Sequence, residues 1–162
     1  LEGHRTDLER LAGPDFDGSE RRSREMAALG NWLQGVPEPL VQIGEPFQVG
    51  AMTLQPFLQD HGYSTTLGFR VGRFAYSTDV IRFDEAALAA LEDLDIWVVD
   101  CVRTDPPHAV HAHLPMTLDW IARVQPRRAV LTHMNQTMDY DTLCRILPQG
   151  VEPAYDGMVL EL

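Results

Sequence analysis

Hydrophobic residues from Val41 onward come in short runs that are typical of β-strands. Each run is long enough for a strand and too short for a helix of ordinary length, and polar or turn-forming residues separate one run from the next. The pattern predicts strands over residues 47–57, 66–76, 96–102, 129–132 and 158–162.

Three further segments have the spacing of a helix that buries one face. Apolar residues recur in them three or four positions apart, which places them on one side of a helix. The segments and their aligned residues are 84–94 with Ala87, Leu88 and Leu91, 116–124 with Leu118, Ile121 and Ala122, and 139–147 with Tyr140, Leu143 and Leu147. A strand-rich first part followed by alternating strands and helices predicts an α/β fold, with helices packed on a mixed sheet.

The first 37 residues have a different pattern from the rest of the chain. They start with polar and turn-forming residues and continue with a helical pattern that Gly35 and Pro37 bring to an end. We therefore divide the chain into an atypical polar and helical segment, residues 1–37, and a main domain, residues 38–162.

Composition narrows the possible classes of function. The chain has 162 residues, 44% of them hydrophobic, which is enough for one domain with a core. Its 13 basic and 24 acidic residues give a net charge of −11, which argues against a nucleic-acid partner or an anionic membrane surface. Two cysteines are too few for a disulfide framework, and no apolar run approaches the roughly 20 residues of a membrane helix. We therefore expect a cytoplasmic protein that makes no membrane contact.

Ligand-type side chains follow the predicted strands. His61 and Asp79 come at the ends of two strands, His133 ends a buried run, and His111 lies in a loop rich in proline and histidine. Loops at strand ends converge on functional sites in layered α/β folds, and imidazole and carboxylate groups are natural ligands of Zn²⁺ and Mn²⁺. Any one of these histidines taken alone is also typical of a hydrogen-bonded structural residue. Asp100 and Cys101 close a buried strand, where Cys101 is expected to be a small core residue.

Four stretches, taken in order, resemble a known family. They are DHGYSTTLGFR, FAYSTDV, AVLTHMNQTMDYD and LPQGVEPAYDGMVLEL. Together they look like the second half of the metallo-β-lactamase superfamily, and in particular like the phosphoribosyl 1,2-cyclic phosphate phosphodiesterases and the related tRNA 3′-processing endonucleases. The resemblance extends from Val41 to the end of the chain. It implies part of an αβ/βα sandwich and a metal-dependent hydrolase.

The resemblance also implies roles for individual residues. His61 and His133 would each bind one of two divalent ions, zinc or manganese, and Asp79 would bridge the two ions and take part in catalysis. His111 would be catalytic and protonate the leaving oxygen of a small phosphate ester. His111, His113 and Asp156 would contact the substrate.

One part of the family pattern is absent. The HxHxDH motif, which supplies further metal ligands, does not occur in residues 1–60, where His4 is the only histidine. The chain also starts at Leu1 rather than at methionine, so we expect a piece of a longer protein, a degenerate family member, or a site that another chain completes. A sheet that lacks its partner sheet would expose apolar residues, which predicts self-association, for example as a homodimer, or instability unless the N-terminal helix covers that face.

Two alternatives to a phosphodiesterase remain open. A family member that keeps the fold without the reaction would act as an interaction module. A tRNA 3′-processing endonuclease is the other alternative, but the short interval between His61 and Asp79 leaves no room for a long tRNA-binding arm, and the acidic net charge also argues against it.

Overall fold

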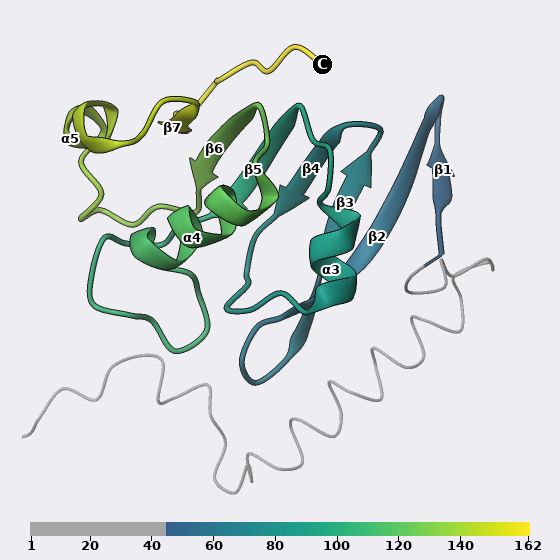
Figure 1. The fold of residues 1–162 in the computed structure, drawn as a ribbon, viewed down its shortest axis with the longest axis horizontal. Helices are drawn as coiled ribbons and strands as arrows, with labels where there is room; N and C mark the ends of the chain where they lie inside the picture. The colour runs from purple at the N-terminus through teal and green to yellow at the C-terminus, as the bar shows by residue number, and fades with distance from the viewer. Residues whose placement is uncertain (1–44) are drawn as a thin grey trace, which may run out of the picture. The chain divides into compact units, whose positions relative to one another are not determined.

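Residues 45–162 are the part of the chain that the computed structural model describes, and they form a mixed sheet with helices packed against it (Figure 1). The strands lie side by side in chain order: β1 (Phe47–Val49), β2 (Met52–Asp60), β3 (Thr65–Val71), β4 (Phe74–Ser77), β5 (Ile96–Asp100), β6 (Arg128–Thr132) and β7 (Val151–Pro153). Pairing is antiparallel from β1 to β4 and parallel from β4 to β7. The α/β fold with a mixed sheet that the sequence predicts is confirmed.

The helices begin where the sequence supplies a cap or a proline. Helix α3 (Glu85–Ala90) follows Asp84, and α5 (Tyr140–Ile146) follows Asp139; each aspartate accepts a hydrogen bond from a backbone N–H of the first turn at 2.8 Å. Helix α4 (Leu114–Val124) has no side-chain cap but has a proline in its first turn. None of the helices in the described residues is long and apolar enough to cross a membrane.

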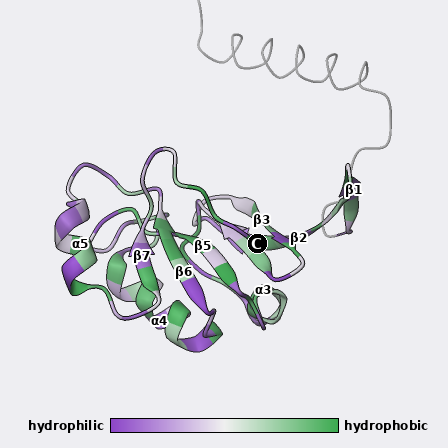
Figure 2. Cartoon of the chain, turned by 90° about the horizontal axis from the view of Figure 1, so that it is seen from above, coloured by the Kyte–Doolittle hydropathy of each residue, from purple (hydrophilic) through white to green (hydrophobic). Residues whose placement is uncertain are grey.

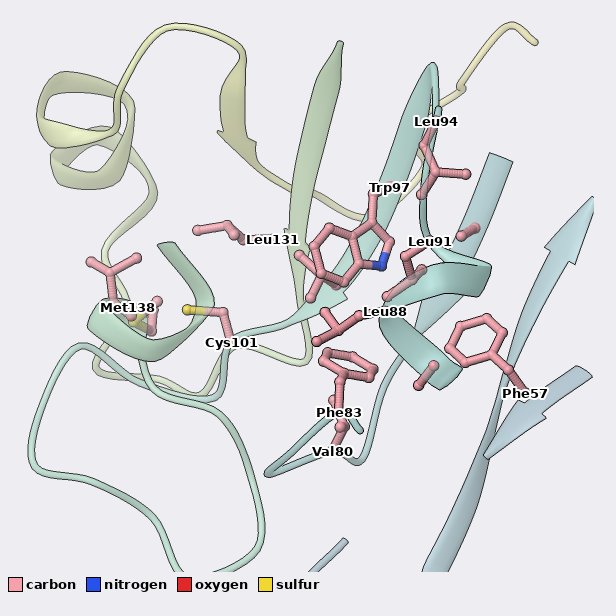
Figure 3. Close-up of a cluster of buried hydrophobic side chains, with 14 of the residues drawn as sticks. Phe57, Val80, Phe83, Leu88, Leu91, Leu94, Trp97, Cys101, Leu131 and Met138 are labelled. Atoms are coloured by element: carbon pink, nitrogen blue, oxygen red, sulfur yellow. The ribbon is translucent and has the colours of Figure 1, made fainter. Parts of the chain in front are cut away.

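The main core lies between the sheet and the helices. Figure 2 shows α3 and α4 on the same side of the sheet, and Figure 3 shows the side chains that fill the space between them. Trp97 of β5 is completely buried at the centre of this core, and its ring N–H donates a hydrogen bond to Ser77 Oγ at 3.0 Å. Leu88 of α3, Leu114 of α4 and Leu131 of β6 belong to the same cluster. Cys101 is also completely buried there, as expected from the sequence.

The opposite face of the sheet is covered less completely. A small cluster of Ile96, Val98 and Val130 is packed against residues of the C-terminal segment. Further along the same face, Leu58 is 50% exposed and Tyr76 is 43% exposed. The sequence predicts self-association through exposed apolar surface of this kind. Self-association remains a prediction.

Two of the predicted strands are wrong because each is in fact a hairpin. Residues 47–57 contain β1 and β2, which are joined through Gly50, and residues 66–76 contain β3 and β4, which are joined through Gly72. These glycines have φ angles of 60° and 57°, which two-residue hairpin turns favour. The hydrophobic alternation continues across such a short turn, so the pattern gives one long run.

The strand predicted over residues 158–162 is also wrong. The last strand is β7, which lies just before this segment, and residues 158–162 are outside the sheet. Met158 and Leu160 instead pack against the second hydrophobic cluster. Alternating apolar residues can cover a sheet face without joining the hydrogen-bonded ladder, which explains the error. The helix predicted before residue 37 and the domain boundary there lie outside the described residues, so both remain predictions.

Close packing of β2 on β3 gives a first test. A Cβ atom at Gly68 would lie 2.3 Å from Phe57 Cζ. We expect Gly68→Ala to lower the free energy of unfolding by about 1–3 kcal/mol, because overpacking outweighs the roughly 0.4–1 kcal/mol gained from a less flexible unfolded chain. Urea denaturation measures the change. A Gly68→Ala, Phe57→Leu double variant should lose less stability than the sum of the two single variants, and simple additivity would contradict this packing.

The two cysteines of the sequence should differ in reactivity. Burial raises the pKa of the Cys101 thiol to about 12, whereas Cys144 is exposed. Because the thiolate is the reactive form, only about one Cys101 thiol in ten thousand is ionised near pH 8. A thiol reagent should therefore modify Cys144 in the native protein and Cys101 only after unfolding. Rapid labelling of a folded Cys144→Ser variant would show that Cys101 is accessible.

Candidate metal centre

Ligand-type side chains converge at one edge of the sheet. Strands β2, β4, β5 and β6 run in the same direction, so their carboxyl ends meet at this edge, which is the lower one in Figure 1. His61 follows β2, Asp79 follows β4, Asp100 ends β5 and His133 follows β6. His111 reaches the same place from the loop between β5 and α4.

Asp79 lies beside two of the histidines. Its Oδ1 atom is 3.9 Å from His61 Nε2 and also 3.9 Å from His111 Nδ1. The ring of His111 lies between the other two, with its centroid 4.7 Å from that of His61 and 4.7 Å from that of His133. The structure thus brings together all four residues that the sequence singles out as ligands or as the catalytic acid.

Asp100 is a part of the site that the sequence interpretation missed. Its side chain has no exposed surface, and its Oδ2 atom accepts a hydrogen bond from the Val80 backbone N–H and lies 3.2 Å from His111 Nδ1. Oδ1 lies 3.2 Å from His133 Nδ1 but has no hydrogen bond of good geometry. The signal in the sequence is a single carboxylate at the end of an otherwise apolar strand, IWVVD.

The backbone at two of the candidate ligands is unusual. Asp79 and His133 have φ angles of 58° and 61°, in the left-handed region that few residues other than glycine adopt. Thr66 Oγ1 donates a hydrogen bond to the Asp79 carbonyl at 2.7 Å, which helps to hold this conformation. Strained backbone of this kind is concentrated at functional sites in proteins.

Space is available next to Asp79 and His133. A cavity of about 170 Å³ is lined by these two residues and by Tyr76, Thr78 and Thr132. A larger cavity of about 460 Å³ lies beside the His61 loop, and its lining includes Tyr63 and Arg82. The smaller cavity has room for an ion and its water ligands, because a water molecule occupies about 30 Å³ of liquid.

The donor atoms fit a divalent metal ion. One ligand atom from each of His61, Asp79 and His111 lies within 4.8 Å of the other two, and the same holds for Asp100, His111 and His133. Imidazole nitrogens and carboxylate oxygens are the ligands that zinc and manganese take, and three protein ligands with an open position are typical of catalytic zinc. The buried, unpartnered Oδ1 of Asp100 is a further sign that a positive charge belongs here.

The other predicted contact residues are placed less centrally. His113 directly precedes α4, and its Nδ1 is buried without a partner; Asp156 is exposed in the turn after β7 and belongs to neither ligand cluster. His108, which was not predicted to be a ligand, accepts hydrogen bonds through Nδ1 from the backbone N–H groups of Val110 and His111. Burial lowers the pKa of His108, and the neighbouring His111 and Arg103 lower it further.

Solved structures share this fold. The crystal structure of a diphosphatase from the PhnP family superposes with a TM-score of 0.73 at 25% identity, covering 84% of this chain and 53% of that one. YhfI from Bacillus subtilis, a metallo-β-lactamase fold protein, has a TM-score of 0.65 at 17% identity, over 83% of this chain and 62% of its own. Zn²⁺-bound PqqB from Methylobacterium extorquens has a TM-score of 0.63 at 17% identity, over 75% and 55% of the two chains.

One curated relative is matched over a smaller part of its own length than the solved structures are. An octanoyltransferase from Porphyromonas gingivalis is 25% identical over 126 residues, which are 74% of this chain and 26% of that protein. The chain therefore spans about a quarter of this relative and about half of the diphosphatase.

A family match covers most of the chain. Residues 5–134 match the family described as the β-lactamase superfamily domain, and the match includes most of the segment that the sequence pattern sets apart as residues 1–37. The folds compared above agree with this assignment. The chain thus belongs to the β-lactamase superfamily and has a metallo-β-lactamase fold.

Proposed function

We propose that this chain is part of a metal-dependent phosphodiesterase that acts on a small phosphate diester, such as a cyclic ribose phosphate. The observation that carries the proposal is the convergence of His61, Asp79, His111 and His133 at one edge of the sheet. Each comes from a different loop, so their meeting is a property of the fold rather than of local sequence.

Three residues would hold two divalent ions, zinc or manganese. His61 would bind one ion, His133 the other, and the Asp79 carboxylate would bridge the two. When bound, such ions generate a nucleophile from water at neutral pH and offset the negative charge of the phosphoryl group. The cavity between Asp79 and His133 is the space that the proposal requires.

His111 would donate the proton that the departing oxygen needs. Its Nδ1 faces the Asp100 carboxylate at 3.2 Å, so a proton on Nδ1 is held there and Nε2 is the nitrogen that can serve the substrate. Asp100 would act as a positioning residue, because its Oδ2 is hydrogen-bonded to His111 Nδ1 and its Oδ1 lies 3.2 Å from His133 Nδ1. Carboxylates that contact the free ring nitrogen of a metal-binding histidine fix its tautomer and orientation in the same way.

Size and charge favour a small substrate. The segment from His61 to Asp79 contains only β3, β4 and their tight turns, and so no arm that would grip an RNA. The net charge of −11 also argues against binding of a nucleic-acid backbone. The structure of human tRNase Z, short form, has a TM-score of 0.53 at 18% identity, a likeness of fold alone.

An interaction module without catalysis is the second candidate. The absence of an HxHxDH motif from residues 1–60 favours it, because the described residues then supply too few ligands to hold two ions tightly. The two candidates differ in metal content, which makes that quantity the decisive measurement.

The metal content of the purified protein should depend on the Asp79 carboxylate. We expect purified protein to contain zinc or manganese by elemental mass spectrometry, and Asp79→Ala to lose it. Hydrolysis of a small phosphate diester should fall with the metal, by about 100-fold or more. Asp141→Ala, which removes an exposed aspartate of α5 outside the clusters, is the matched control and should keep its metal. A metal-free wild-type protein would leave the interaction module as the function.

Asp100→Asn should impair catalysis more for some substrates than for others. The amide keeps the volume but loses the charge that faces His111 and His133, so metal affinity should fall about 10- to 100-fold. At saturating metal, kcat should fall further for a diester with an alkyl leaving group than for one with a nitrophenolate, which needs no proton. Asp95→Asn, at the other end of β5, is the control. An equal loss for both substrates would exclude an effect through the acid His111.

A further inference from the structure

The ring of His61 is oriented by a backbone carbonyl of another loop. His61 Nδ1 lies 2.7 Å from the carbonyl oxygen of Val110, which can only accept a hydrogen bond. Nδ1 must therefore carry the proton, and the lone pair is on Nε2, the nitrogen that lies 3.9 Å from Asp79. In this way Val110 selects the tautomer in which His61 can serve as a ligand.

Val110 also packs directly on the residue after His61. Gly62 has a φ angle of 74°, and a Cβ atom there would lie 2.8 Å from Val110 Cγ1 and 3.2 Å from the carbonyl oxygen of Ala109. The two loops therefore touch with no space for a side chain. Gly72 has a similar φ of 57°, yet nothing lies within 4 Å of its Cβ position. The need for glycine at Gly62 thus comes from the contact as well as from the backbone angle.

Both loops are fixed by further hydrogen bonds. Asp60 Oδ1 accepts the Gly62 N–H at 2.7 Å, while its Oδ2 is paired with Arg82. On the opposite side, His108 Nδ1 accepts the N–H groups of both Val110 and His111. A shift of Val110 relative to Gly62 must therefore displace His111 as well.

We propose that Val110 is a positioning residue for His61, and that its contact with Gly62 couples this ligand to the loop that carries His111. The positions of the candidate ligand, His61, and of the candidate acid, His111, then depend on each other. The coupling rests on the proposed function only in treating His61 as a metal ligand; the tautomer and the packing are properties of the metal-free protein.

The first test is the tautomer of His61 in metal-free wild-type protein. Long-range proton–nitrogen NMR at alkaline pH, where imidazoles are neutral, distinguishes a proton on Nδ1 from one on Nε2. We expect a single tautomer protonated on Nδ1. A His61 protonated on Nε2, or an even mixture, would overturn the proposal without any variant having to fold.

The second test separates the contact from backbone strain. Gly62→Ala should give a mixture of His61 tautomers and lower zinc affinity about 10-fold or more, measured by competition with a chromogenic chelator. Gly72→Ala carries similar strain without the contact and should leave both properties unchanged. Adding Val110→Ala to Gly62→Ala removes the clashing methyl groups and should restore much of the zinc affinity. Equal effects of the two glycine variants, or no rescue, would contradict the coupling.

The outcomes also distinguish this inference from the proposed function. A fixed Nδ1-protonated tautomer that Gly62→Ala disturbs, in a protein that binds no zinc, would support the positioning role of Val110 and reject the phosphodiesterase. If the protein binds zinc and hydrolyses a diester, and Gly62→Ala leaves both properties intact, the phosphodiesterase is supported and the positioning role of Val110 is rejected.

Discussion

The carboxyl edge of the sheet depends on one buried charge, that of Asp100. A carboxylate with no exposed surface is costly unless hydrogen bonds or opposite charges compensate it. Here a backbone N–H from the β4–α3 connection and two histidine rings face its oxygens. Strand β5, which carries Asp100, is buried along its whole length, so the carboxylate cannot move toward solvent. The hydrogen-bond donors that stabilise the Asp100 carboxylate must therefore come from the surrounding loops.

This arrangement explains how side chains from separate loops meet at one site. Thr117 of α4 donates a hydrogen bond to the Asp100 carbonyl, which ties the helix to the end of the strand. The loop that precedes α4 carries His111 toward the carboxylate and presents the Val110 carbonyl to His61. His61 and His111 are thus each held through Nδ1, the first by the Val110 carbonyl and the second by the Asp100 carboxylate.

The sequence predicts much of this because the relevant signals are local. Buried runs that end in His or Asp identify His61, Asp79 and His133, and the ordered stretches around them suggest a fold that brings them together. The run IWVVD also ends in a carboxylate, but the partners that give Asp100 its role lie 11 and 33 positions away, and no local pattern reveals them. The Val110 carbonyl has no signal at all, since every residue carries one. The hairpins at Gly50 and Gly72 were missed because alternation persists through a two-residue turn.

The left-handed backbone at Asp79 and His133 affects how distant relatives should be interpreted. At a φ near 60°, β-branched and bulky residues are strongly disfavoured, while aspartate, asparagine, histidine and glycine are tolerated. Selection for folding alone would therefore tend to retain such residues at both positions, even in a lineage that no longer performs any reaction. Aspartate and histidine at these positions in an alignment are therefore only weak evidence that a relative is still catalytic. Replacement by asparagine or glycine, which keeps the backbone conformation but removes the ligand, is the change that indicates a loss of catalysis.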